Sequence, residues 1–90
     1  MKVEFDKSFE KWLSKVNHKG LLKKIEVSIL QLESARSLDQ LPNIKKLNGY
    51  PSYYRIKIGN YRIGFELIKK STIRLLIVAD RQDIYKKFPK

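Results

Sequence analysis

Cysteine is absent from this chain of 90 residues. Its absence excludes disulfide bonds, thiolate nucleophiles and cysteine metal sites. It is also typical of proteins that work in a reducing compartment. We therefore expect a cytoplasmic protein whose fold is held by packing rather than by covalent cross-links.

Histidine is nearly absent from the chain, and acidic residues, which could bind metal ions, are scarce in its basic second half. His18 is the only histidine, which excludes a ribonuclease mechanism with two histidines, and we interpret it as a solvated residue of a turn. Residues 45–90 contain three carboxylates, Glu66, Asp80 and Asp83. These are few for a two-metal nuclease, which needs several carboxylates around its ions. The sequence shows no glycine-rich phosphate loop and no serine-based triad. We expect no metal ion and no cofactor, and any catalytic groups would be cations and a tyrosine.

Long apolar runs are also missing. Residues 1–12 interleave charged and aromatic side chains, so we expect neither a secretory signal nor a membrane-spanning helix, and no membrane partner. The apolar fraction of 42% is ordinary for a globular chain, and 90 residues provide one modest core. We therefore predict a single domain, residues 1–90.

Positive charge, by contrast, is in excess. The formal net charge is +11, and it is unevenly distributed. Residues 1–44 carry eight Lys/Arg against six Asp/Glu, whereas residues 45–90 carry twelve against three. A field of one sign opposes folding through self-repulsion and attracts polyanions. A well-solvated basic surface is the simpler interpretation, but the asymmetry favours binding of a polyanion or an acidic partner.

Apolar residues in the first half recur at helical spacing. Residues 2–6 alternate and predict a short first strand. Residues 9–16 and 21–32 then each place an apolar stripe on one side of a helix, with Asp6 or Ser8 as the first N-cap. The break between them is so short that it predicts an antiparallel helical hairpin.

In the second half the apolar period changes from 3.6 to 2. Strands are predicted over residues 53–58, 61–68 and 73–79. Gly59-Asn60 separates the first two and favours a two-residue hairpin loop. The third is apolar on both faces, as expected for a strand inside a sheet.

These elements predict an α+β fold. An N-terminal helical hairpin packs on one face of a small antiparallel β-sheet, and a short C-terminal tail or helix follows at residues 81–88. Residues 37–51, punctuated by prolines and Asn48-Gly49, are expected to be irregular.

The register of the predicted hairpin follows from its loop. With Gly59-Asn60 as the loop, three apolar pairs share one face, and this face must meet the helices. The pairs are Ile58–Tyr61, Ile56–Ile63 and Tyr54–Phe65. The other face pairs Lys57 with Arg62 and Arg55 with Gly64.

Two cations directly opposite each other on a sheet repel, which indicates that the outer face is retained for an anion. Gly64 would leave room there for a ligand backbone. Polar filling of an outer face is the simpler alternative, and it accounts for one cation better than for three. The strand over residues 73–79, if antiparallel to residues 61–68, ends near the Gly59-Asn60 turn, and Arg81 follows it. We therefore expect Lys57, Arg62 and Arg81 to converge within reach of one phosphate, with Arg55 one step further. We also expect replacement of Arg62 to leave the fold intact.

Two central runs carry a family resemblance. Residues 46–49, Lys-Leu-Asn-Gly, and 53–63, Tyr-Tyr-Arg-Ile-Lys-Ile-Gly-Asn-Tyr-Arg-Ile, resemble the central signature of RelE/ParE toxins. The opening residues 5–13 and the closing residues 80–85 are similar as well, so the resemblance covers nearly the whole chain. Members of this superfamily share the helical hairpin on an antiparallel sheet.

The resemblance also implies an activity and a site. The RelE branch consists of ribosome-dependent endoribonucleases that cut mRNA by attack of the ribose 2′-OH on its own phosphate, without metal. Implied partners are a cognate antitoxin, the ribosome and mRNA. By position, the family's catalytic basic residues and its late tyrosine fall on Arg55, Lys57, Arg62, Arg81 and Tyr85. Lys57 is the candidate proton acceptor, and the arginines stabilise charge on the phosphate. Arg55 stands where some members have lysine, and Asp80 stands where many have histidine.

Two other functions stay open. The ParE branch inhibits DNA gyrase on the same fold and has no nuclease activity, whereas a non-catalytic RNA-binding module needs only the basic face. The full set of basic residues with the Arg81–Tyr85 tail favours the nuclease, because ParE-like chains generally lack it. For Tyr85 itself, stacking on an unpaired base and packing against the sheet edge both remain open.

Overall fold

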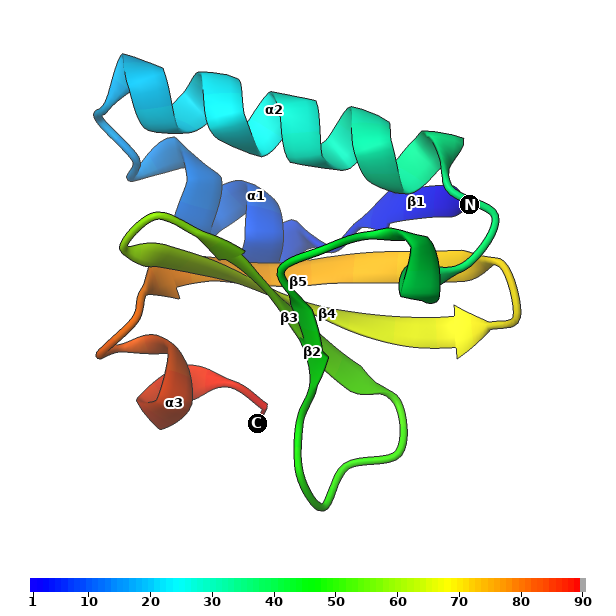
Figure 1. Cartoon of the computed structure of the whole chain (residues 1–90). Helices are drawn as coiled ribbons and strands as arrows, with labels where there is room; N and C mark the ends of the chain where they lie inside the picture. Colours follow the sequence, from blue (N-terminus) through cyan, green and yellow to red (C-terminus); the bar gives the residue numbers. More distant parts are fainter. Residues whose placement is uncertain (90) are drawn as a thin grey trace.

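The computed structural model describes residues 1–89, which form a five-stranded sheet with helices on both faces (Figure 1). In chain order the elements are β1 (Lys2–Phe5), α1 (Lys7–Ser14), α2 (Lys19–Ser34), the 3-10 turn η1 (Leu38–Gln40), β2 (Ile44–Lys46), β3 (Tyr53–Ile58), β4 (Tyr61–Lys69), β5 (Thr72–Asp80) and α3 (Ile84–Lys87). The helical hairpin α1–α2 covers one face, and α3 lies on the other (Figure 1). This arrangement confirms the predicted α+β fold.

The strand order is β1-β5-β4-β3-β2. Strands β2 to β5 are antiparallel neighbours, whereas β1 runs parallel to β5, so the sheet is mixed rather than wholly antiparallel. The helical hairpin follows β1 and carries the chain over one face of the sheet. Strand β5 lies inside the sheet, as its continuous apolar run predicted.

Strand β2 corrects the expectation that residues 37–51 are irregular. Its three residues pair antiparallel with β3 and form one edge of the sheet. So short a strand shows no alternation of apolar and polar residues, and only its pairing with β3 defines it.

The predicted hairpin register is confirmed. Ile56 lies opposite Ile63, Lys57 opposite Arg62 and Arg55 opposite Gly64. Gly59 begins the loop with φ +57°, a left-handed conformation that glycine adopts without steric cost.

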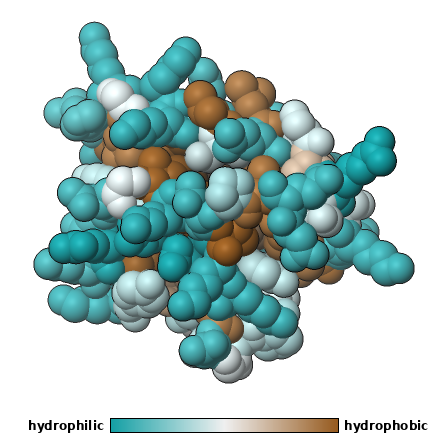
Figure 2. All heavy atoms as spheres, in the orientation of Figure 1, coloured by the Kyte–Doolittle hydropathy of each residue, from teal (hydrophilic) through white to brown (hydrophobic). Residues whose placement is uncertain are grey.

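Hydrophilic side chains cover much of the face seen in Figure 2, and hydrophobic atoms surface along α2 at the top of the view. Among residues 1–89, none of the helices combines the length and the apolar composition that a membrane span requires.

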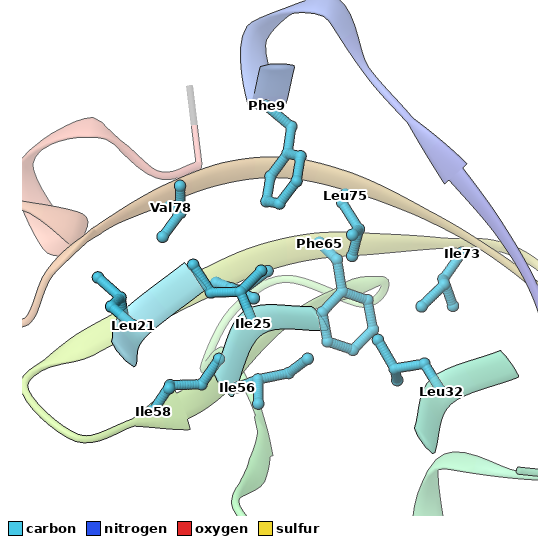
Figure 3. Packing of buried hydrophobic residues seen from close by; sticks show 11 residues of the cluster. Phe9, Leu21, Ile25, Leu32, Ile56, Ile58, Phe65, Ile73, Leu75 and Val78 are labelled. Atoms are coloured by element: carbon cyan, nitrogen blue, oxygen red, sulfur yellow. The ribbon is translucent and has the colours of Figure 1, made fainter. Parts of the chain in front are cut away.

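The main core lies between the sheet and the α1–α2 hairpin. Its side chains from β3, β4 and β5 point toward those of α1 and α2 (Figure 3). The residues are Phe9, Leu21, Ile25, Leu32, Ile56, Ile58, Ile63, Phe65, Ile73, Leu75 and Val78. Every apolar pair predicted for the inner face of the hairpin belongs to this core or packs against it.

A second, smaller core lies on the opposite face of β5. Gly64 pairs with Ile77 but the next residue of β4 pairs with Leu75, so Leu76 is an extra residue in β5. This irregularity changes the alternation, because Leu75 faces the main core whereas Ile77 and Ala79 belong to the second cluster. One strand thereby supplies both cores.

Side chains cap both long helices. The Asp6 carboxylate accepts hydrogen bonds from the Ser8 hydroxyl at 2.6 Å and the Ser8 backbone N–H at 3.0 Å, which lowers the pKa of Asp6 below its ordinary value. The stability that this contact adds is present above the ordinary pKa and is lost as pH falls through the lowered one. His18 is exposed, as expected, and its Nδ1 also accepts from the Leu21 backbone N–H at 2.9 Å to cap α2.

Ile56 tests the assignment of the inner face. Its side chain is 5% exposed, so replacement by Ala should lower the free energy of unfolding by about 2–4 kcal/mol. Ile68 on β4 is 38% exposed and provides the matched control, whose replacement should cost well under that amount. Urea denaturation of both variants measures the difference, and equal losses would contradict the assignment.

Candidate functional site

The C-terminal segment covers part of the outer face, the face opposite α1 and α2. Ile84 and Phe88 are buried with Ile77 and Ala79 in the second core. A Cβ atom at Gly64 would lie 2.7 Å from the Phe88 ring, so glycine at this position makes room for Phe88. The expectation that Gly64 leaves space for a ligand backbone is therefore wrong, because the protein's own tail fills that space.

Two aromatic contacts hold the tail in place. The Lys87 ammonium lies 4.4 Å from the centroid of the Trp12 ring on α1, and the rings of Phe88 and Tyr53 are 5.4 Å apart. The tail therefore has a fixed position, and it presents Tyr85 with its side chain 62% exposed.

Arg62 is buried rather than open to solvent. It is 9% exposed, and its Nη1 donates hydrogen bonds of 2.9 Å to the carbonyl oxygens of both Gly59 and Tyr61. Its opposite residue on β5 is Ala79, which the tail buries, and this explains why the outer face is closed here. The prediction of an exposed Arg62 is wrong, and its Nε atom has no hydrogen-bond partner among residues 1–89.

Arg81 and Lys57 lie at the same end of the sheet as Arg62. The Arg81 backbone N–H donates to the Asn60 carbonyl at 2.8 Å, which confirms that β5 returns to the hairpin turn. The Arg81 side chain is exposed. Lys57 is exposed as well, but it lines a hollow together with Lys23 and Lys24 of α2. The three predicted cations are thus neighbours around one turn, although Arg62 is directed to the turn's own carbonyls.

Arg55 and Tyr85 line one groove of about 370 Å³ between the tail and strands β2 and β3. The other residues that line it are Lys45, Lys46, Leu47, Asn48, Tyr50, Phe88 and Pro89. Lys45 lies directly opposite Arg55, a second like-charge pair across neighbouring strands. Lys45, Lys46 and Tyr50 were not among the predicted site residues, because β2 was not predicted and Tyr50 lies in the loop between β2 and β3. The sequence signal that could have found them is the Lys45-Lys46 pair shortly before the Asn48-Gly49 turn.

The cations of this face are not neutralised by the protein's own carboxylates. Within the described part of the chain the ion pairs are Lys23–Glu26 and Arg74–Glu4, and neither includes a residue of the groove. Asp80 is occupied otherwise, since its Oδ1 accepts from the backbone N–H groups of Gln82 and Asp83 at 3.0 and 2.9 Å. It therefore holds the turn that precedes α3.

The groove combines two kinds of group that suit one ligand chemistry. Lysine and arginine donate charged hydrogen bonds to phosphate oxygens. Exposed tyrosine rings offer flat surfaces for unpaired bases. An extended polyanion with planar groups matches both.

Comparison with known proteins identifies relatives along the whole chain. Residues 3–85 match the family described as ParE toxin of the type II toxin–antitoxin system parDE. The chain is 44% identical over 91 residues to Toxin RelE3 of Methanocaldococcus jannaschii, covering 99% of this chain and 100% of that protein.

Solved structures give the same result for the fold. A chain in the crystal structure of the RelB–RelE antitoxin–toxin complex from Methanococcus jannaschii superimposes with a TM-score of 0.79 and 40% identity, over 96% of this chain and 99% of that one. The archaeal RelE–RelB complex from Pyrococcus horikoshii shares the fold, with a TM-score of 0.70 and 23% identity over 89% and 93% of the two chains.

The buried position of Arg62 generates a prediction about stability. Replacement of Arg62 by Ala leaves two turn carbonyls without their donor and should lower the free energy of unfolding by about 1–3 kcal/mol. Replacement of the exposed Arg81 by Ala is the matched control and should change it by less than about 0.5 kcal/mol. Urea denaturation measures both, and an unchanged midpoint for the Arg62 variant would contradict a structural role.

Proposed function

The chain belongs to the RelE/ParE superfamily of type II toxins, and on this basis we propose that it is an endoribonuclease that cleaves mRNA on the ribosome and thereby inhibits translation. The observation that carries the proposal is the groove that Arg55 and Tyr85 line together. The exposed cations Lys57 and Arg81 flank the Gly59-Asn60 turn of the same sheet. No carboxylate is among the residues that line the groove within residues 1–89. Such a surface attracts the RNA backbone.

In the proposed reaction the ribose 2′-oxygen attacks the adjacent phosphorus. The bond from phosphorus to the 5′-oxygen breaks, which leaves a 2′,3′-cyclic phosphate, and the released 5′-oxygen takes up a proton from water to become a 5′-hydroxyl. Arg55 and Arg81 stabilise negative charge on the non-bridging oxygens through planar, charged donors. The neutral amine form of Lys57 accepts the proton of the 2′-hydroxyl, since the ammonium form has no lone pair. Every one of these groups belongs to the chain, and the reaction requires no metal ion.

Arg62 has an indirect role in this proposal. Its two hydrogen bonds fix the Gly59-Asn60 turn, and the Asn60 carbonyl in turn holds the backbone of Arg81. Arg62 therefore positions Arg81 and adds positive potential from beneath the surface.

The proposed dependence of cleavage on the ribosome follows from the limits of a site made of cations. They hold a phosphate and stabilise its transition state, but they do not align the 2′-hydroxyl for in-line attack. Alignment contributes several kcal/mol to phosphoryl transfer. We propose that the ribosome supplies it by holding the mRNA.

Cleavage assays test this function directly. The purified protein should cut mRNA on ribosomes in EDTA concentrations that spare them, and should cut naked RNA slowly or not at all. Lys57→Ala and Arg81→Ala should each lower the rate by at least tenfold, because each removes a group at the phosphate. Lys70→Ala removes an exposed cation from the turn between β4 and β5 and should leave the rate unchanged. Products are measured by gel and by end-group analysis.

A second function has a specific observation in its favour, because the matching family is described as ParE toxin. Inhibition of DNA gyrase is the corresponding activity. A supercoiling assay at the same protein concentrations distinguishes the two. Blocked supercoiling without any cleavage on translating ribosomes would establish the gyrase function and refute the nuclease.

We further propose a cognate antitoxin as partner, since a relative of solved structure that is 40% identical to this chain lies in a RelB–RelE antitoxin–toxin complex. An acidic segment would lie across Arg55, Lys57 and the surface above Arg62. Apolar anchors fit α2, where Val27 and Leu30 are 43% and 55% exposed beside a hollow that also includes Leu41 and Pro42.

Salt dependence and one substitution test the mode of antitoxin binding. Association should slow as ionic strength rises, because charge complementarity acts mainly on the association rate. Leu30→Glu should weaken binding by about tenfold or more, since it places a charge among the apolar anchors. Lys70→Ala serves as the control. Stopped-flow association insensitive to salt would contradict masking of the cationic face.

A further inference from the structure

An aromatic row runs from the tail to the edge of the groove. The rings of Phe88 and Tyr53 are 5.4 Å apart, and those of Tyr53 and Tyr50 are 5.8 Å apart with an interplanar angle of 39°. Phe88 is buried at one end of the row, whereas Tyr50 is 44% exposed at the other. Tyr50 is therefore supported from one side and open on the side that lines the groove.

The backbone around Tyr50 is also fixed. Leu47 donates its N–H to the Tyr53 carbonyl at 2.9 Å, and Tyr50 donates to the Leu47 carbonyl at 3.3 Å. Gly49 between them adopts φ +83°, which the loop requires and most side chains disfavour. A ring held in this way loses little conformational entropy when a planar ligand stacks on it.

Charged groups lie beside this ring. Lys45, Lys46 and Arg55 line the same groove, and none of them forms an ion pair within residues 1–89. Asn48 adds an amide that both donates and accepts hydrogen bonds. On the opposite wall the exposed Tyr85 provides a second ring.

We propose that this groove is a binding site for one unpaired nucleotide of single-stranded RNA, with its base stacked on Tyr50. Lys45, Lys46 and Arg55 hold the flanking phosphates, and Tyr85 closes the site from the tail. The choice of RNA over other anions rests on the proposed function. The volume of about 370 Å³ lies in the range of small-ligand pockets and suits one base with its ribose. An acidic peptide matches the charges equally well but has no flat group for Tyr50.

Binding of an RNA that cannot be cleaved tests the site apart from catalysis. The probe is a fluorescein-labelled hexamer with 2′-O-methyl groups throughout, and its affinity for the purified protein is measured by fluorescence anisotropy. Tyr50→Ala should weaken binding by about tenfold, since a stacked base contributes strongly to affinity. Tyr50→Phe should stay within about twofold of the parent because it keeps the ring. Lys46→Ala should weaken binding and reduce its salt dependence.

Two matched controls lie outside the groove. Ile68→Ala removes an exposed apolar side chain from β4, and Lys70→Ala removes an exposed cation at the β4–β5 turn, so neither should change the affinity beyond about twofold. A duplex of the same sequence should bind more weakly, because its bases are not free to stack. Circular dichroism melting of each variant separates loss of binding from loss of fold.

Three results would overturn the proposal: no binding of the hexamer by the parent protein, an unchanged affinity for the folded Tyr50→Ala variant, or displacement of the hexamer by a poly-glutamate peptide at comparable concentration. The last result would assign the groove to an acidic protein segment. Because the probe is uncleavable and ribosomes are absent, failure here leaves the nuclease assay untouched. Conversely, binding of the hexamer through Tyr50 without any cleavage of mRNA would contradict only the proposed nuclease activity.

Discussion

The contact between Phe88 and the bare backbone of Gly64 determines how the outer face is divided. It seats the tail on β4 and β5, so that the second core forms there and Arg62 is enclosed. It also makes the tail one wall of the groove, with Tyr85 opposite the β2–β3 edge. A side chain at position 64 would push the tail away, and the face would become an open basic sheet with no groove.

Much of the fold could be predicted from the sequence because the signals were local. The helical spacing of residues 9–32 and the Gly59-Asn60 loop determine the hairpins, and the loop alone sets the register from Tyr53 to Glu66. The parallel pairing of β1 and the short strand β2 could not be predicted. The alternation of residues 2–6 predicts β1 as a strand but not its neighbour, and the three residues of β2 are too few to show a period.

The candidate site could be predicted only in part: Arg55 and Tyr85 were predicted, whereas Lys45, Lys46 and Tyr50 and the shape of the groove were not. Alternation correctly assigned Arg55, Lys57 and Arg62 to the outer face, yet it carries no information on what covers that face. The tail packs on Ala79 and Arg62 is buried against the carbonyls of the turn, whereas Arg55 faces a groove that lies between three separate segments. Burial of an arginine against turn carbonyls is a tertiary outcome. The charge distribution therefore identified the basic outer face, but it did not show that Arg62 is buried there and that Arg55 lines an open groove.

The extra residue in β5 has a consequence for how the sequence can change. Leu76 shifts the phase of the strand: Ile73 and Leu75 before it face the α1–α2 hairpin, and after it Val78 faces the hairpin whereas Ile77 and Ala79 pack with the tail. The Leu76 carbonyl also accepts a hydrogen bond from the Ser8 hydroxyl at 2.7 Å, which connects α1 to β5 at this extra residue. A deletion of one residue there would restore a regular pleat and exchange the two faces of everything that follows. A substitution in this strand therefore affects one position, whereas a single insertion or deletion changes the face on which every downstream side chain lies.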